Sequence, residues 1–341
     1  MELGIILGNI PTNISEKDHF DSILRQAEAV QKAGMTHILV GQHFHFEGSR
    51  WFQPVPLLAR LAGELDPSVR LCTQILIGPL YNPVMLAEEL ATLDVVTGGR
   101  ISVGLGLGYI PKEYETFGIP FKERGRRLNE IIEILKLMWT QDRVTYDGKY
   151  YQLDDLAVHI KPVQKPHPPI WVGAGSDAGI RRAARLGDAW PITPQETPEE
   201  LPELLGKYFD FREEAGRPRE GRVPLRREIM IGRDREDALA KAVDVASEWY
   251  LNMAATGHNE YVDPEGLRKS IPGVMAKHWV LGSAEEVAGQ LRDIGSVVPV
   301  DPIITRANWP GMSTQDSVDY IELLGKELVP SLKEFEGVTS M

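Results

Sequence analysis

The chain has 341 residues, of which 43% are hydrophobic and 25% charged, and its formal net charge is −12. A chain of this length buries roughly three quarters of its unfolded surface when it folds. The acidic balance excludes a nucleic-acid partner, because phosphate backbones are bound by clustered Lys and Arg. No run reaches the roughly 18 apolar residues of a membrane span, and the chain shows no signal peptide at its start. These features, with Cys72 as the single cysteine, predict a cytoplasmic protein without an intrachain disulfide, whose thiol packs in a buried strand.

Short β-branched runs alternate with longer segments that carry apolar residues at i, i+3, i+4 spacing, as at Ile131, Leu135 and Met138. Parallel strands need helical crossovers and burial on both faces, so this alternation favours an α/β fold. Eight such pairs without a composition break predict one domain over residues 1–341, a closed (β/α)₈ TIM barrel, with an open doubly wound sheet as the alternative. The predicted strands are Leu3–Leu7, His37–Val40, Leu71–Ile77, Ile101–Leu105, Ile170–Val172, Ala189–Ile192, Glu228–Ile231 and Pro302–Thr305.

Two stretches interrupt this rhythm. In residues 143–163, Asp147-Gly148 lies between alternating aromatic and β-branched residues, which predicts a hairpin inserted on the barrel rim. Residues 254–277 are rich in Gly, Asn, Asp and Pro and have no steady period. Long irregular loops in compact domains are often lids, so we expect a mobile lid here.

A glycine-rich turn into a helix follows the predicted strand Ile170–Val172, from Gly173 through Ala174, Gly175 and Ser176. Unpaired backbone N–H groups and the helix dipole make such a turn a phosphate site. The alternatives are a turn capped by Ser176 without any ligand, or a dinucleotide fingerprint, which belongs in the first strand–helix unit of its domain.

Two further strand ends carry candidate residues. Gly104, Gly106 and Gly108 alternate after the fourth predicted strand and leave room for a flat ring, or else allow close helix–strand packing. His43 follows the second predicted strand, and barrel active sites lie at carboxyl strand ends, so it is placed for acid/base chemistry. His43 and His45 also form a metal-type pair, but the other histidines do not fall at strand ends, so we expect no metal site. Paired carboxylates at strand ends and a nucleophile elbow are both missing.

The sequence resembles the bacterial luciferase-like family of flavin and deazaflavin oxidoreductases over almost its whole length. The matching segments are Val40–Phe44, Pro83–Arg100, Gly104–Gly108, Phe121–Arg124, Tyr146–Tyr151 and Gly173–Trp190. The resemblance implies a barrel with reduced flavin at its carboxyl face and a non-proline cis peptide at Gln74-Ile75 behind the ring. It also implies phosphate contacts from Ala174, Gly175 and Ser176, a pocket lined by Gly106 and Leu107, and an acid/base role for His43.

The departures from the family bear on the cofactor. Deazaflavin-dependent dehydrogenases that resemble sugar-phosphate oxidisers have acids where this chain has Gln42 and Tyr109, which favours FMN over coenzyme F420. The interpretation is therefore a monooxygenase that uses O₂ and reduced FMN from a separate flavin reductase, and acts on a small organic, largely apolar substrate. The alternatives are F420-dependent hydride transfer and a flavin-binding barrel without catalysis.

The sequence leaves the roles of some residues undecided. Arg227 is placed either at the carboxyl face or as a paired rim charge. Aromatic residues near the strand ends line an apolar pocket or belong to the core: Phe44, Phe46, Trp51, Phe52 and Trp309. The apolar face of Leu86, Leu90 and Leu93 packs either on the barrel or on a partner subunit, in line with an expected homo-oligomer.

Overall fold

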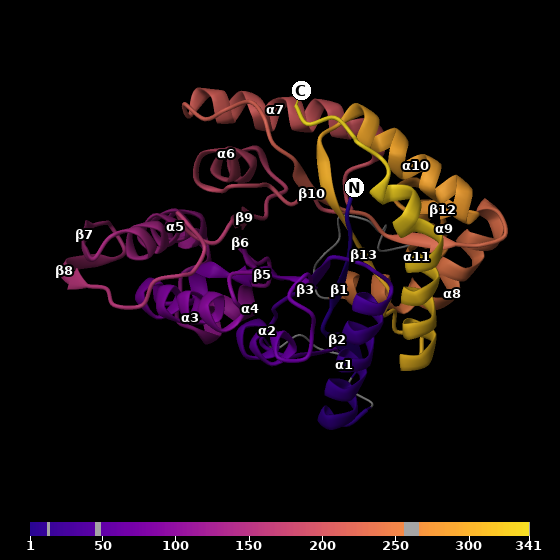
Figure 1. Cartoon of the computed structure of the whole chain (residues 1–341), viewed down its shortest axis with the longest axis horizontal. Coiled ribbons are helices and arrows are strands. Elements are labelled where there is room, and N and C mark those ends of the chain that lie inside the picture. The colour runs from indigo at the N-terminus through magenta and orange to yellow at the C-terminus, as the bar shows by residue number, and fades with distance from the viewer. Residues whose placement is uncertain (12–13, 45–48, 256–265, 341) are drawn as a thin grey trace.

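The computed structural model describes residues 1–11, 14–44, 49–255 and 266–340 (Figure 1). Its main sheet has seven parallel strands in the order β10-β13-β1-β3-β5-β6-β9. These strands are β1 (Leu3–Leu7), β3 (His37–Val40), β5 (Arg70–Ile77), β6 (Ile101–Gly106), β9 (Ile170–Val172), β10 (Val223–Arg226) and β13 (Val300–Arg306). Their side chains are almost all buried, as expected of strands that pack on both faces.

The segment Ala189–Ile192 closes this sheet into a ring. Ala189 forms a parallel bridge to Trp171 in β9, and Ile192 forms a parallel bridge to Leu225 in β10. Backbone hydrogen bonds of 2.9 and 3.0 Å accompany the two bridges. The segment thus takes the sixth place in the ring, between β9 and β10. The predicted (β/α)₈ barrel is confirmed, and the open sheet is not what forms.

The prediction for the seventh strand was wrong. Its place in the ring belongs to β10 (Val223–Arg226), while residues of the predicted strand form β11 (Ile229–Ile231), which pairs with β12 (Val280–Gly282) in a separate two-stranded sheet. Pro224 lacks a backbone N–H and argues against a strand at that position. The register of β10 against β13 shifts between Val223 and Leu225, which accommodates the proline.

Eleven α-helices lie in the described part of the chain, and most of them surround the barrel (Figure 1). They are α1 (Glu16–Lys32), α2 (Pro54–Ala62), α3 (Pro83–Val96), α4 (Pro111–Thr116), α5 (Arg124–Thr140), α6 (Asp177–Leu186), α7 (Leu201–Glu214), α8 (Arg235–Ala255), α9 (Leu267–His278), α10 (Ala284–Val297) and α11 (Thr314–Lys333). Short 3₁₀ turns cover Gly78–Leu80, Phe121–Glu123 and Pro198–Glu200, and β2 (Asn9–Pro11) pairs antiparallel with β4 (Ser49–Trp51). Leu86, Leu90 and Leu93 of α3 are at most 2% exposed, so this face packs on the barrel.

The rim carries the predicted hairpin. Strands β7 (Arg143–Asp147) and β8 (Gln152–Ala157) pair antiparallel and project beside α5 at one end of the molecule (Figure 1). Glu130 of α5 accepts hydrogen bonds from the backbone N–H groups of Lys149, Tyr150 and Tyr151, at 2.9 to 3.2 Å. The carboxylate therefore ties the hairpin loop to the barrel's helical shell.

The expected irregular lid at 254–277 is only partly described. Residues 256–265 lie outside the described residues, while Leu267–His278 forms helix α9, contrary to the expectation. Ile271 and Met275 are fully buried at i, i+4 spacing, and this burial stabilises the helix despite Pro272 inside it.

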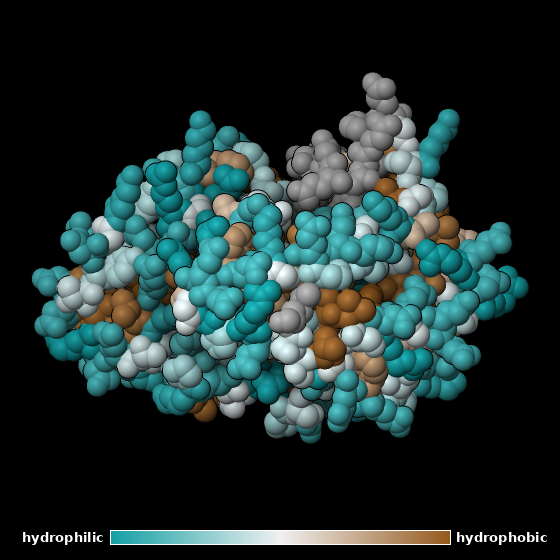
Figure 2. Space-filling view, turned by 90° about the horizontal axis from the view of Figure 1, so that it is seen from above, coloured by the Kyte–Doolittle hydropathy of each residue, from teal (hydrophilic) through white to brown (hydrophobic). Residues whose placement is uncertain are grey.

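Within the part of the chain that the structure describes, no helix is long and apolar enough to cross a membrane. The face shown in Figure 2 is mostly hydrophilic, with apolar side chains gathered in small areas.

Candidate functional site

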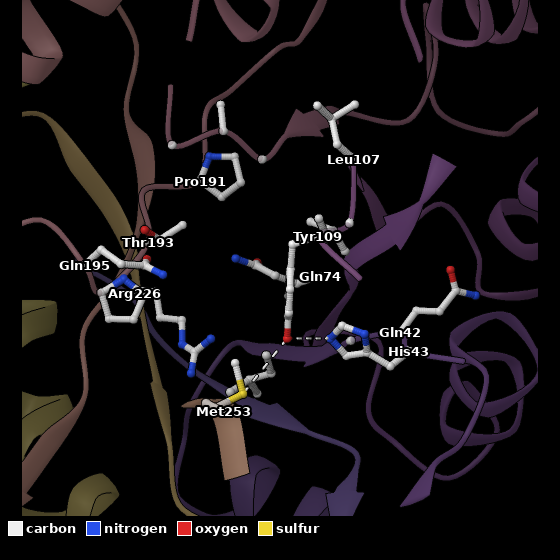
Figure 3. Close-up of a pocket in the computed structure, with 18 of the residues that line it drawn as sticks. Gln42, His43, Gln74, Leu107, Tyr109, Pro191, Thr193, Gln195, Arg226 and Met253 are labelled. Atoms are coloured by element: carbon white, nitrogen blue, oxygen red, sulfur yellow. Dashed lines mark hydrogen bonds between the residues drawn. The ribbon is translucent and has the colours of Figure 1, made fainter. Parts of the chain in front are cut away.

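A cavity of about 480 Å³ opens at the carboxyl ends of the barrel strands. Residues from opposite sides of the ring point into it, among them His43 after β3, Gln74 in β5, Tyr109 after β6 and Arg226 at the end of β10 (Figure 3). Of the residues expected at the site, the following line the cavity: His43, Gln74, Ile75, Leu107, Ala174, Gly175 and Ser176. The structure therefore brings most of the residues expected at the site together in one pocket.

Gly106 does not line the cavity. A Cβ at Gly106 would lie 1.8 Å from Cδ1 of Ile75, and one at Gly104 would lie 1.9 Å from the Thr73 carbonyl oxygen. The space beside these glycines is thus filled by β5, which bulges where its register against β6 shifts between Thr73 and Leu76. The peptide bond Gln74-Ile75 within this bulge is cis, as the family resemblance implied. Gly106 acts on the pocket indirectly, by letting Ile75 pack against β6 and face the cavity.

The turn from β9 into α6 offers backbone donors to the cavity. Ser176 caps α6, with its hydroxyl accepting from the Gly179 N–H at 3.3 Å. No hydrogen bond to another described residue occupies the N–H groups of Ala174, Gly175 and Ser176. A Cβ at Gly175 would meet no atom within 4 Å, so open space lies above the turn. This arrangement suits an anion at the positive end of the helix dipole.

Arg182, one helical turn and a half into α6, adds positive charge to this side of the cavity. Its Nε donates to Oδ1 of Asn129 at 2.6 Å, which fixes the guanidinium. Burial lowers the pKa of Arg182, and the nearby charges of Arg185 and Arg124 lower it further. A bound anion would relieve this repulsion.

His43 lies between a buried carboxylate and a phenol. Its Nδ1 is 3.2 Å from Oε1 of Glu113, and its Nε2 is 3.4 Å from the hydroxyl of Tyr109 (Figure 3). Glu113 opens α4, is fully buried, and also accepts the backbone N–H of Phe44 at 2.6 Å. The imidazole packs edge-on against Trp51, with ring centroids 4.8 Å apart. Glu113 and Trp51 thus fix the orientation of the imidazole, and its Nε2 faces the Tyr109 hydroxyl.

The opposite wall carries a cluster of charged residues that the sequence analysis missed. Arg226 ends β10, Arg306 ends β13, and Glu228 follows β10 by two residues; all three line the cavity. Arg226 pairs with Glu228 through Nη2 and Oε1. Burial lowers the pKa of Arg306 to about 9, with the charge of Arg226 contributing. The signal was present for Arg306, because a cation directly follows the predicted strand Pro302–Thr305.

Glu113 was missed for a different reason. It lies in a short helix that starts with Pro111 after the glycine-rich strand, and nothing in its spacing links it to His43, 70 residues earlier. Gln42 also lines the cavity, but its amide points away from His43 (Figure 3). Its Oε1 accepts the Ile77 N–H at 2.9 Å and its Nε2 donates to Gln53 at 2.6 Å, so it fixes the end of β5.

The remaining open residues divide between pocket and core. Trp51 and Trp309 line the cavity, whereas Phe44 and Phe52 do not, and His45 and Phe46 lie outside the described residues. Arg227 is fully buried and donates to the carbonyl oxygens of Thr193 and Arg226 at 3.1 Å, so it is not a rim charge. No cluster of three or more His, Cys, Asp or Glu with metal-binding geometry occurs among the residues that the structure describes.

Residues 1–298 match the family model described as luciferase-like monooxygenase. The chain belongs to this family. Among its relatives, the oxygenase component of the flavin-dependent trigonelline monooxygenase of Acinetobacter baylyi is 27% identical over 293 residues, which cover 82% of this chain and 81% of that protein. The F420-dependent glucose-6-phosphate dehydrogenase of Segniliparus rotundus is 27% identical over 323 residues, covering 89% and 92%. The solved structure of monooxygenase RslO1 from Streptomyces bottropensis matches with a TM-score of 0.83 and 26% identity, over 97% of this chain and 100% of that one.

These luciferase-like relatives are flavin-dependent monooxygenases and F420-dependent oxidoreductases. The family resemblance inferred from the sequence is therefore confirmed, and with it the broad class of oxidoreductase. Both cofactor types occur among relatives of equal identity, so the choice between FMN and F420 rests on this chain's own residues.

Proposed function

We propose that this chain is the oxygenase component of a two-component monooxygenase that uses reduced FMN and O₂ to oxygenate a small organic substrate with an apolar body. One observation carries the proposal. The donor-rich turn at Ala174–Ser176, the apolar wall of Ile75 and Leu107, and the acid/base candidate His43 all face one cavity. A phosphate-bearing cofactor with a flat ring has complementary parts in that arrangement.

The residues present fit FMN. The N–H groups of Ala174, Gly175 and Ser176 would hold its phosphate, with Arg182 supplying charge. Oε1 of Gln74 is buried and has no hydrogen-bond partner among the described residues, and it would accept an N–H of the ring. Reduced FMN, when bound, supplies the electrons that activate O₂.

The residues around His43 define what this chain can do with a proton. With Glu113 ionised, the proton of a neutral His43 is held on Nδ1, which leaves Nε2 to accept from Tyr109 or from a reacting group. When His43 accepts that proton, the buried carboxylate of Glu113 stabilises the imidazolium. Glu113 does not line the cavity, so it acts through His43 as a positioning residue.

Two positions that carry acids in some deazaflavin enzymes have neutral residues in this chain, which supports FMN over F420. Gln42 and Tyr109 stand where the sugar-phosphate-type deazaflavin dehydrogenases carry acids, and in the structure Gln42 is bound into the end of β5. Glu113 does bring a carboxylate to His43, but on the side of the ring away from Tyr109.

The proposal includes partners. A separate flavin reductase would supply reduced FMN, as the name of the trigonelline relative, an oxygenase component, suggests. Self-association would cover apolar side chains that α3 and the segment after β8 leave exposed, among them Met85, Val96 and Ile160. Sedimentation of the purified chain tests this part, and a monomer at micromolar concentration would contradict it.

An anaerobic titration with reduced FMN and reduced F420 tests the cofactor. We expect reduced FMN to bind and reduced F420 to bind far more weakly; the opposite order would overturn the proposal in favour of hydride transfer. Turnover then separates catalysis from simple binding. We expect product only when O₂ is admitted, and His43→Ala should abolish it while Arg233→Met, a change at a side chain that is 83% exposed, preserves it. No product from the unaltered chain with reduced FMN bound would indicate a barrel that binds flavin without catalysis. An unchanged rate for His43→Ala would rule out the acid/base role of His43.

A further inference from the structure

The far wall of the cavity presents a charged group that the proposed cofactor does not use. We call Arg226, Arg306 and Glu228 the arginine pole. Figure 3 shows the guanidinium of Arg226 extending from β10 toward the middle of the cavity, on the side opposite His43. Its side chain is 19% exposed and that of Glu228 is 4% exposed, so the pair lies inside the pocket and not on the outer surface. Guanidinium groups are costly to desolvate and are normally paired when they are buried.

The arginine pole places two guanidinium groups beside one carboxylate. Nη2 of Arg226 donates a hydrogen bond to Oε1 of Glu228. Oε2 of Glu228 and Nε of Arg226 are both buried and have no partner among the described residues. The other carboxylate in the lining, Glu196, accepts the Thr193 hydroxyl at 2.9 Å and has the charge of Arg227 nearby. Nη1 of Arg226 makes no hydrogen bond to a described residue and is not among the buried atoms, so this donor is available to the cavity.

The proposed cofactor has its own anion site in a different part of the ring. The turn after β9 and the bulge in β5 are separated only by β6, so a phosphate at the turn and a ring at the bulge fit on one side. β10 and β13 follow each other on the opposite side, beyond the segment Ala189–Ile192 in one direction and β1 and β3 in the other. The arginine pole thus faces the region that remains for substrate.

Apolar surface adjoins the pole. The guanidinium of Arg306 lies 4.4 Å from the ring centroid of Trp249 and 5.2 Å from that of Trp309. Met253 of α8 also lines the cavity and accepts a hydrogen bond from the Tyr109 hydroxyl at 4.0 Å. A ligand that satisfies both features has an anionic group at one end and an apolar, preferably flat, body.

From these contacts we infer that the arginine pole binds a carboxylate on the substrate, and that the substrate is an organic acid. A carboxylate matches the planar fork of Arg226, and its negative charge is attracted by both guanidinium groups. Calling the ligand a substrate rests on the proposed function, whereas the carboxylate site itself is argued only from Arg226, Arg306 and Glu228. It adds to the proposed function that the substrate carries a carboxylate on its otherwise apolar body. The substrate would bind with this carboxylate away from His43.

Calorimetric titration of the full-length chain without added flavin tests the site. The probes are benzoate and cyclohexanecarboxylate, their neutral amides, and inorganic phosphate. We expect at least one acid to bind at least about 10-fold more tightly than its amide, and Arg226→Met to remove that difference while Arg226→Lys keeps part of it. Arg233→Met is the matched control, because that side chain is 83% exposed, and should change nothing.

Two results would overturn the inference. One is equal binding, or no binding, of each acid and its amide to the unaltered chain, a comparison that needs no variant and so does not depend on how Arg226→Met folds. The other is binding of inorganic phosphate that Arg226→Met removes while no acid binds, which would make the pole a phosphate site. Because these titrations contain no flavin, failure here leaves reduced FMN binding untouched, and failure of reduced FMN to bind leaves the organic acid site standing.

Discussion

Replacing Gly106 with alanine tests how the β5 bulge is supported. The new Cβ would lie 1.8 Å from Cδ1 and 3.1 Å from Cγ1 of Ile75. Carbon atoms in contact are normally about 3.5 to 4 Å apart, so Cδ1 must move by about 2 Å. Overpacking of this kind typically costs about 1 to 3 kcal/mol in the free energy of unfolding. The side chain of Ile75 lines the cavity, so its displacement should also weaken the binding of reduced FMN.

Urea unfolding and an anaerobic flavin titration measure the two effects. Ile75→Val removes Cδ1, so the double variant with Gly106→Ala should regain most of the stability lost by Gly106→Ala alone. Gly289→Ala on α10 is the matched control; its Cβ would meet no atom within 4 Å, and it should be neutral or up to about 1 kcal/mol more stable. If Gly106→Ala binds reduced FMN as the unaltered chain does, or Ile75→Val gives no rescue, the proposed support of Ile75 by this glycine is wrong.

Three further predictions concern charge. Glu113→Gln should lower product formation by about 10- to 100-fold and alter its pH profile, with reduced FMN affinity nearly unchanged, because it loses a charge-assisted bond to His43; an unchanged pH profile would rule out positioning by the carboxylate. Arg182→Met should weaken reduced FMN binding by about 10-fold without affecting benzoate, and equal loss of both ligands would show a general defect. Burial, with the charge of Arg70, lowers the pKa of His37 to about 4. The unfolded chain then binds the extra proton first, so up to about 3 kcal/mol of stability is present above pH 6.5 and lost as the pH falls toward 4. Urea unfolding at several pH values should show a shallower loss for His37→Gln, and an unchanged slope would contradict this.

The barrel was predictable because its ring strands are buried on both faces and therefore appear as short apolar runs. The sequence analysis misplaced one of the eight ring strands, where Pro224 and Arg227 interrupt neighbouring runs and two short strands compete for one place. Helix α9 was missed because Pro272 and Gly273 conceal its buried stripe of Ile271 and Met275. In both regions, packing against the rest of the barrel outweighs the local sequence preference.

The candidate site was predictable where it depends on local chain features. The turn at Gly173–Ser176 and the position of His43 after its strand can both be inferred from a few neighbouring residues. The contact of Glu113 with His43, and the gathering of Arg226 and Arg306 on one wall, depend on which strand ends lie together in the folded barrel. The position of Arg306 directly after a predicted strand was a signal, but Arg226 lies at the end of the ring strand that the sequence analysis misplaced, so the arginine pole became visible only in the folded chain.

A crystal structure of this chain with bound FMN tests the account most directly. It should show the phosphate at the N–H groups of Ala174, Gly175 and Ser176, and the ring against Ile75 within reach of His43, with Arg226 and Arg306 free of cofactor. A phosphate bound instead by Arg226 and Arg306, or a ring on the opposite side of the cavity from Ile75, would contradict both the proposed cofactor site and the assignment of the opposite wall to substrate.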